Sequence, residues 1–73
     1  MHTITIEATV THIEERTAEI TDNATGEVMT IQHPGDLLDD KDVRVGTQLT
    51  CEYETRNTGT DNEQRWLVEY EPK

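Results

Sequence analysis

The chain has 73 residues, with sixteen acidic and six basic side chains that give a formal net charge of −10. A chain this short has room for one domain, residues 1–73, and for a single small core. It cannot enclose the deep, desolvated pocket that most enzymes need. Its one cysteine, Cys51, excludes an internal disulfide and a metal-binding cysteine pair.

Two β-strands are expected in the first part of the chain. Residues 3–13 alternate between apolar and polar side chains, with Ile4, Ile6, Ala8 and Val10 on one face. This period of two is typical of a strand with one buried face. After a turn, residues 17–21 form the second strand, in which Ala18 and Ile20 point inward.

The third strand, residues 27–32, follows an Asp-Asn-Ala-Thr-Gly turn in which Gly26 supplies the positive φ. Its pattern is ambiguous, because Val28, Met29 and Ile31 fall on both faces. We expect this strand to be short, bulged or covered on both sides.

A long connection, residues 33–46, interrupts the strand pattern at Pro34-Gly35. We expect Asp36 to cap a single helical turn whose Leu37 and Leu38 plug one end of a barrel. The aspartates of this segment carry the oxygen ligands that Ca²⁺ and Mg²⁺ prefer, but their spacing does not match an EF-hand loop. A solvated acidic loop is therefore favoured over a metal site.

Two further strands complete the pattern. The fourth begins after Gly46 and points Leu49, Cys51 and Tyr53 inward. A polar loop over residues 56–63 leads to the fifth strand, residues 64–71. There we expect Trp66, Val68 and Tyr70 on the core face and Leu67 on the opposite face.

Three strands, a long connection and two strands is the order of the oligonucleotide/oligosaccharide-binding (OB) fold. In length, and in lacking a full helix between strands three and four, the chain resembles the cold-shock type of that barrel. The step Val45-Gly46-Thr47 into the fourth strand is also similar to the Val-Gly-polar step that is common in such barrels. We predict an all-β, five-stranded, OB-like barrel, with an SH3-like barrel as the alternative.

The OB resemblance implies single-stranded nucleic-acid binding. Such binding needs a basic groove and exposed stacking aromatics. Arg56 and Arg65 flank the polar residues 57–64 and offer a small basic clamp beside Trp66, although Trp66 is also read as a core residue. The outward Thr and Glu side chains of strands one and four repel phosphate, so this function is kept as the alternative.

Catalytic and metal-binding functions have little support in the sequence. The chain has no serine, and Cys51 lies on the inward face of its strand, where a thiol is a small hydrophobic side chain. His2, His12 and His33 are scattered without the spacing of zinc ligands. We therefore predict a protein that is not an enzyme and uses no cofactor or metal.

The remaining function is interaction with a protein partner or with a second copy. The edge strands of a small, partly open barrel accept a partner's strand. We expect Leu67 and one of Val28 and Met29 to point outward and form a modest apolar patch for this contact. The alternative is that these residues are scattered surface side chains.

The expected location is the cytoplasm. The first residues lack the basic region and continuous apolar run of a signal peptide, and no stretch approaches the roughly 18 apolar residues of a membrane span. Thirteen threonines and only two lysines accompany the acidic residues. This composition resembles cytoplasmic proteins of salt-loving archaea, with an acidic mesophilic or phage protein as the alternative.

Overall fold

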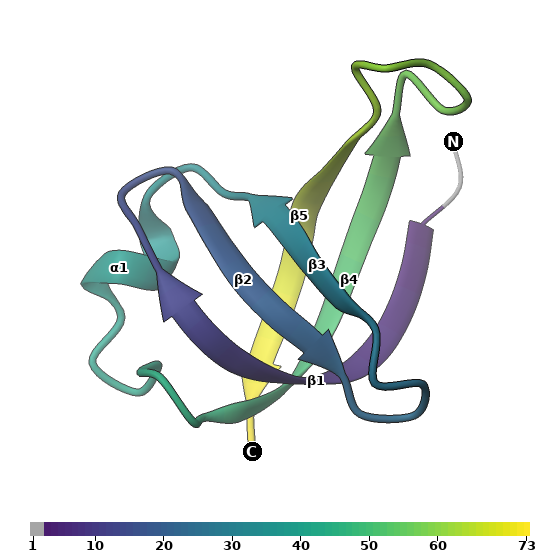
Figure 1. Cartoon of the computed structure of the whole chain (residues 1–73). Helices are drawn as coiled ribbons and strands as arrows, with labels where there is room; N and C mark the ends of the chain where they lie inside the picture. The colour runs from purple at the N-terminus through teal and green to yellow at the C-terminus, as the bar shows by residue number, and fades with distance from the viewer. Residues whose placement is uncertain (1–2) are drawn as a thin grey trace.

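The computed structural model describes residues 3–73 and shows five strands and one short helix (Figure 1). The elements follow the expected order of three strands, a connection with one helical turn, and two strands. Their bounds are β1 Thr3–Ile13, β2 Thr17–Asp22, β3 Val28–Gln32, α1 Asp36–Asp39, β4 Gln48–Arg56 and β5 Gln64–Pro72. No helix in the described residues is long and apolar enough to cross a membrane.

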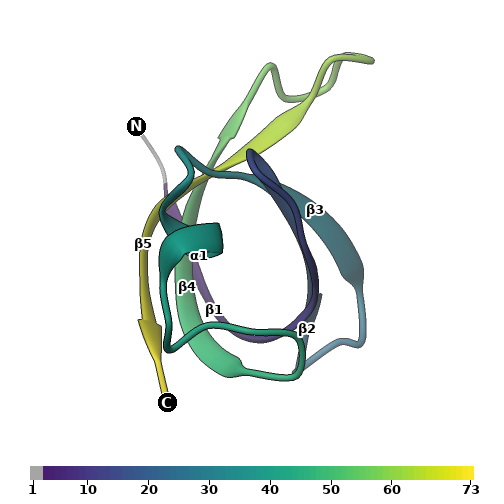
Figure 2. The ribbon, with the colours of Figure 1, turned by 90° about the vertical axis from the view of Figure 1, so that its left-hand side faces the viewer.

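The five strands form one ring-like sheet in the order β1-β2-β3-β5-β4, with β4 returning to β1 (Figure 2). All neighbours are antiparallel except β3 and β5, which are parallel. The long strand β1 serves two neighbours: Thr3–Thr9 pairs with β4, and the part from Ala8 onward pairs with β2. In the pairing of β1 with β2, the register shifts between Val10 and His12. Such a bulge bends the strand that carries it.

The core lies inside the ring and is mostly aliphatic. The alternation predicted for the second and fourth strands is confirmed, because its inward residues are buried. Ile4, expected on the core face, is 46% exposed because β2 accompanies β1 only from Ala8 onward. The buried apolar residues are Ala8, Val10, Ala18, Ile20, Met29, Ile31, Leu37, Val43, Leu49, Cys51 and Tyr53.

The faces predicted for the fifth strand are wrong at three residues. Between Glu52 and Tyr53 the register with β4 shifts, so that Glu52 opposes Glu69 while Tyr53 opposes Leu67. Val68 is the extra residue of this bulge, and it is 50% exposed rather than buried. Leu67 therefore shares the core face with Tyr53 and packs against the core.

Trp66 is the third residue whose face differs from the prediction. It opposes Glu54, whose neighbour Tyr53 points inward, so Trp66 lies on the outer face of the sheet. The bulge at Val68 thus exchanges the faces of the residues that precede it. Only Tyr70, which follows the bulge, keeps the predicted contact with the core.

The connection between β3 and β4 closes one end of the ring as a plug, but with different side chains. Leu37 is buried at 2% exposure, whereas Leu38 is 51% exposed and does not enter the core. Val43, at 6% exposure, supplies the second buried side chain. The residue before α1 is Gly35 with φ 111°, so Asp36 is the first helical residue and not the expected cap.

Because of the bulge in β5, we expect two adjacent apolar residues to differ in their contribution to the free energy of unfolding. We expect Leu67→Ala to cost about 2 kcal/mol of unfolding free energy, because it removes methyl groups packed on the core. Val68→Ala should stay within about 0.5 kcal/mol, as is usual for an exposed site. Urea unfolding followed by circular dichroism measures both values. A loss for Val68→Ala equal to that for Leu67→Ala would contradict the bulge.

Candidate interaction surface

The strand β3 has a backbone edge that points away from β2. At its two ends, the Asp22 N–H donates to the Glu27 carbonyl over 2.8 Å and the His33 N–H donates to the Arg16 carbonyl over 2.9 Å. Backbone groups of an antiparallel strand point alternately toward and away from the partner. The N–H and C=O groups of Val28 and Thr30 therefore point away from β2, and we name these groups the β3 edge.

The β3 edge has little strand pairing on its far side. Within residues 3–73, β3 and β5 share a single residue pair, Gln32 with Trp66. Because the two strands are parallel and meet near the end of β3, the start of β3 lies beside the region that precedes β5. Figure 1 shows β3 diverging there from the projecting β4–β5 hairpin. Of the described strands, only β2 pairs with Val28 and Thr30.

The side chains of β3 resolve the ambiguity of its sequence. Met29 is 4% exposed and Ile31 is 1% exposed, so both enter the core, while Val28 is 58% exposed. Val28 is therefore the outward member of the pair Val28 and Met29. The expected patch of Leu67 with Val28 or Met29 does not form, because Met29 and Leu67 both face the core.

The structure divides the expected basic clamp between two faces. The Arg56 guanidinium lies 4.4 Å from the centre of the Trp66 ring, and Arg56 also pairs with Glu54 at 2.6 Å. Arg65 opposes Thr55, one residue out of phase with Trp66, and so lies on the other face of the hairpin. Only Arg56 and Trp66 come together.

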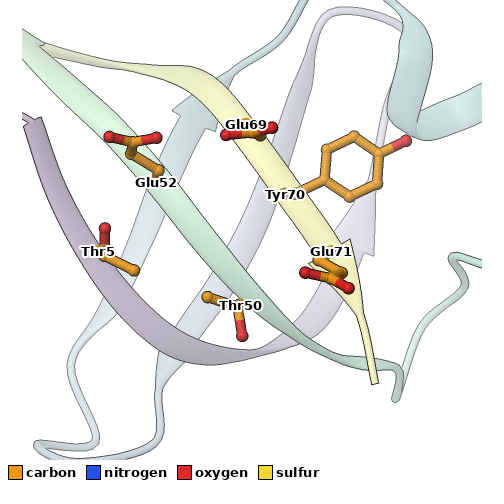
Figure 3. A pocket seen from close by; sticks show the side chains of 6 residues that line it. All are labelled: Thr5, Thr50, Glu52, Glu69, Tyr70 and Glu71. Carbon is orange, nitrogen blue, oxygen red and sulfur yellow. The ribbon is translucent and has the colours of Figure 1, made fainter.

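The outer face of β1, β4 and β5 is acidic. A hollow of about 400 Å³ lies on this face. The residues that line it are Thr5, Thr50, Glu52, Glu69, Tyr70 and Glu71 (Figure 3). Glu52 and Glu69 oppose each other directly, an arrangement that repels. Lys73 pairs with Glu7 at 2.7 Å at the rim. This face matches the outward Thr and Glu positions expected from the sequence.

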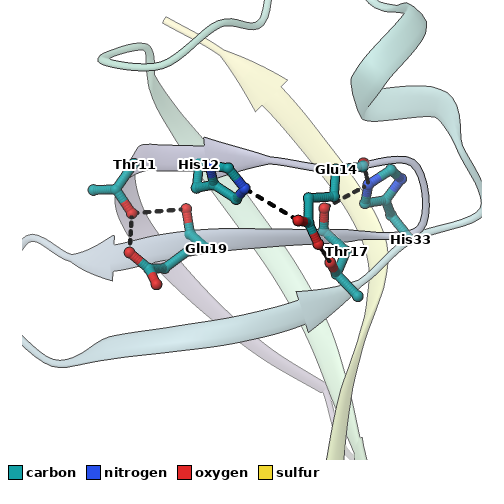
Figure 4. A network of polar contacts seen from close by, with 6 residues as sticks. All are labelled: Thr11, His12, Glu14, Thr17, Glu19 and His33. Carbon is teal, nitrogen blue, oxygen red and sulfur yellow. Dashed lines mark hydrogen bonds and ion pairs between the residues drawn. The ribbon is translucent and has the colours of Figure 1, made fainter.

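His33 is a structural residue that the sequence did not mark. Its ring is 2% exposed, and its Nε2 lies 2.9 Å from the Glu14 carbonyl and 3.2 Å from the Thr17 carbonyl (Figure 4). Since carbonyls only accept hydrogen bonds, Nε2 donates to them, and Nδ1 accepts from the Gly35 N–H over 2.9 Å. Of the other histidines, His12 pairs with Glu14 at the surface, and His2 lies outside the described residues.

A hydrogen bond ties the long connection to β5. The Tyr70 hydroxyl donates to the Asp40 carboxylate over 2.5 Å. This bond, with that from the Asp42 N–H, lowers the pKa of Asp40. Burial, followed by the bond to Asp40, raises the pKa of Tyr70 to about 12. Asp40 therefore holds the connection to β5 as well as bonding within it. No group of three or more His, Cys, Asp or Glu that could hold a metal ion occurs in the described part of the chain.

Removing the Tyr70 hydroxyl gives a pH-dependent prediction. We expect Tyr70→Phe to lower the melting temperature near neutral pH. The difference should shrink in acid as the pH falls from 3.8, the usual pKa of Asp40, through its lowered value. It should also shrink in base, as the pH rises from 10.0 through the raised value of about 12 for Tyr70.

Thermal unfolding across this pH range measures the effect. Tyr53→Phe is the matched control, because it removes a hydroxyl from the other tyrosine that packs on the core. A Tyr70→Phe difference that stays constant from acid to base would contradict the proposed role of the bond.

Comparison with known proteins does not assign the chain to a family. No family model, curated protein or solved structure matches it. The likeness to known folds is therefore one of architecture alone: a small, five-stranded, ring-like, all-β sheet.

Proposed function

We propose that this protein is a non-catalytic interaction module that binds an extended protein segment along the β3 edge. The observation that carries this proposal is the direction of the Val28 and Thr30 backbone groups, which point away from β2 and have no strand paired with them on their far side in residues 3–73. A partner strand placed there completes the hydrogen bonds that a sheet offers at its edge.

The fold we propose for this module is an OB-like barrel. The strand order β1-β2-β3-β5-β4 and the short helix between β3 and β4 support it. In this arrangement β3 and β5 pair at one position, Gln32 with Trp66. The start of β3 therefore has no strand paired on its far side and can accept a partner strand. The proposed function follows from this limited pairing between β3 and β5 and does not require a deep pocket.

The state of Cys51 supports a role without catalysis. Its side chain is 1% exposed, and burial raises the pKa of its thiol to about 12. The thiolate that a cysteine nucleophile requires is therefore disfavoured at neutral pH. The thiol serves as a small apolar side chain of the core, in the place the strand pattern gives it.

We also propose that the module works in a cytoplasm of high salt. The net charge of −10 and the acidic outer face support this setting, because salt near 1 M shortens the Debye length to about 3 Å and suppresses repulsion. Strand addition suits such a setting. Its backbone hydrogen bonds and apolar contacts do not rely on attraction between opposite charges, which salt weakens.

An uncharged strand-forming peptide tests the β3 edge. We expect a capped Thr-Val-Thr-Val-Thr peptide in molar KCl to shift the amide resonances of Val28 and Thr30 more than those elsewhere in the protein. Thr30→Pro should abolish this binding, because it removes an N–H that points to the partner. It leaves the β2 pairing intact, since proline is tolerated at an edge whose N–H faces solvent.

The control is Thr58→Pro, which places a proline in the 56–63 loop. A retained amide spectrum shows that each variant folds. Peptide binding that survives in Thr30→Pro, or shifts spread evenly over the chain, would disprove strand addition at this edge.

Single-stranded nucleic-acid binding is the second candidate, supported by the contact between Arg56 and Trp66. Trp66 is half-buried, and an accessible aromatic ring beside an arginine is a platform on which a base stacks. Titration with a short oligothymidine at low salt is expected to shift the Trp66 indole signal, and Trp66→Ala should remove the binding. An unchanged Trp66 signal at low and high salt would eliminate this candidate.

A further inference from the structure

We infer that the segment bound at the β3 edge is the same edge of a second copy, so that the protein forms a two-fold dimer whose stability increases with salt. This inference rests on the proposed function and names its partner. It depends on two features of β3, an uncharged sequence and a self-complementary backbone, and on the repulsive net charge of the chain as a whole.

The sequence of β3 lacks the protection that edge strands usually carry. Natural edge strands avoid pairing with other chains through charged side chains, proline or a bulge. The segment Val28–Gln32 contains no charged residue and no proline, and its register with β2 is regular throughout. Its outward side chains, Val28 and Thr30, are both exposed and have the branched shape that favours strands.

The backbone of this edge is complementary to itself. In an antiparallel pair centred on Met29, Val28 of one copy opposes Thr30 of the other. Each copy then contributes the N–H and C=O groups of Val28 and Thr30, which are the groups that point away from β2. Gln32 keeps its pairing with Trp66 in this register. The pairing also places exposed Val28 against Thr30 of the second copy, which covers part of its apolar surface.

Charge determines when this dimer forms. Each copy carries a net charge of −10, and Glu27 and Glu19 lie beside the edge as exposed carboxylates. In dilute buffer the two copies repel. At about 1 M salt the repulsion is confined to about 3 Å, while the backbone hydrogen bonds and the apolar contact persist. Salt therefore promotes this association, whereas it weakens a complex held by opposite charges.

Analytical ultracentrifugation from tens of millimolar to molar KCl tests the inference. We expect monomer at low salt and dimer at molar salt. Val28→Glu should weaken the dimer at least tenfold, because it adds a carboxylate inside the pairing. Val45→Glu is the matched control: Val45 is 63% exposed, and the same substitution there adds the same charge away from the edge. Thr30→Pro should remain monomeric at every salt concentration.

The outcomes separate this inference from the proposed function. A protein that binds the Thr-Val-Thr-Val-Thr peptide at the β3 edge but stays monomeric in molar KCl disproves the dimer and keeps the interaction module. A protein that does neither loses both. A dimer that survives both Val28→Glu and Thr30→Pro, or that is weakened equally by Val45→Glu, uses another surface and overturns the inference. A dimer that dissociates as salt rises overturns it as well.

Discussion

The buried imidazole of His33 holds together the end of the molecule where the sheet gives way to connections. One nitrogen donates to the carbonyls of Glu14, in the β1–β2 turn, and of Thr17, the first residue of β2, and the other accepts from the Gly35 N–H just before α1. The Glu14 carbonyl and the Gly35 N–H lie outside the strands, and the imidazole satisfies their hydrogen bonds. The Thr17 carbonyl, at the start of β2, also accepts from the Glu14 N–H over 2.8 Å. The ring thus bonds the end of β1 and the start of β2 to the connection that carries Leu37 into the core.

The strands were predictable because their faces differ in polarity over several residues. The alternation of Ala18 with Ile20, and of Leu49 with Cys51 and Tyr53, placed the core side of β2 and β4 correctly. The prediction failed where the pairing itself decides the face. A bulge sets two residues against one of a neighbouring strand, so it is defined by the register between strands and not by either sequence alone.

The candidate site was less predictable than the fold. Val28 and Met29 are adjacent apolar residues, and only the register with β2 shows which of them points outward. Arg56 and Arg65 flank the same loop in the sequence, yet lie on opposite faces because they differ in phase across the hairpin. His33 carries no spacing signal, since its partners are backbone atoms whose identity leaves no trace in the sequence. The β3 edge could not be predicted either, because it depends on the lack of a second paired strand beside Val28 and Thr30 in the described residues.

The bulge at Val68 also bears on how the length of this chain can vary. Leu67 and Tyr70 both face the core although three positions separate them, which a regular strand does not allow. Without Val68 they would stand two positions apart, and Glu69 alone would lie between them on the outer face. A one-residue gap at this position in related sequences would therefore preserve both faces of β5, and such a gap is the evolutionary trace to look for.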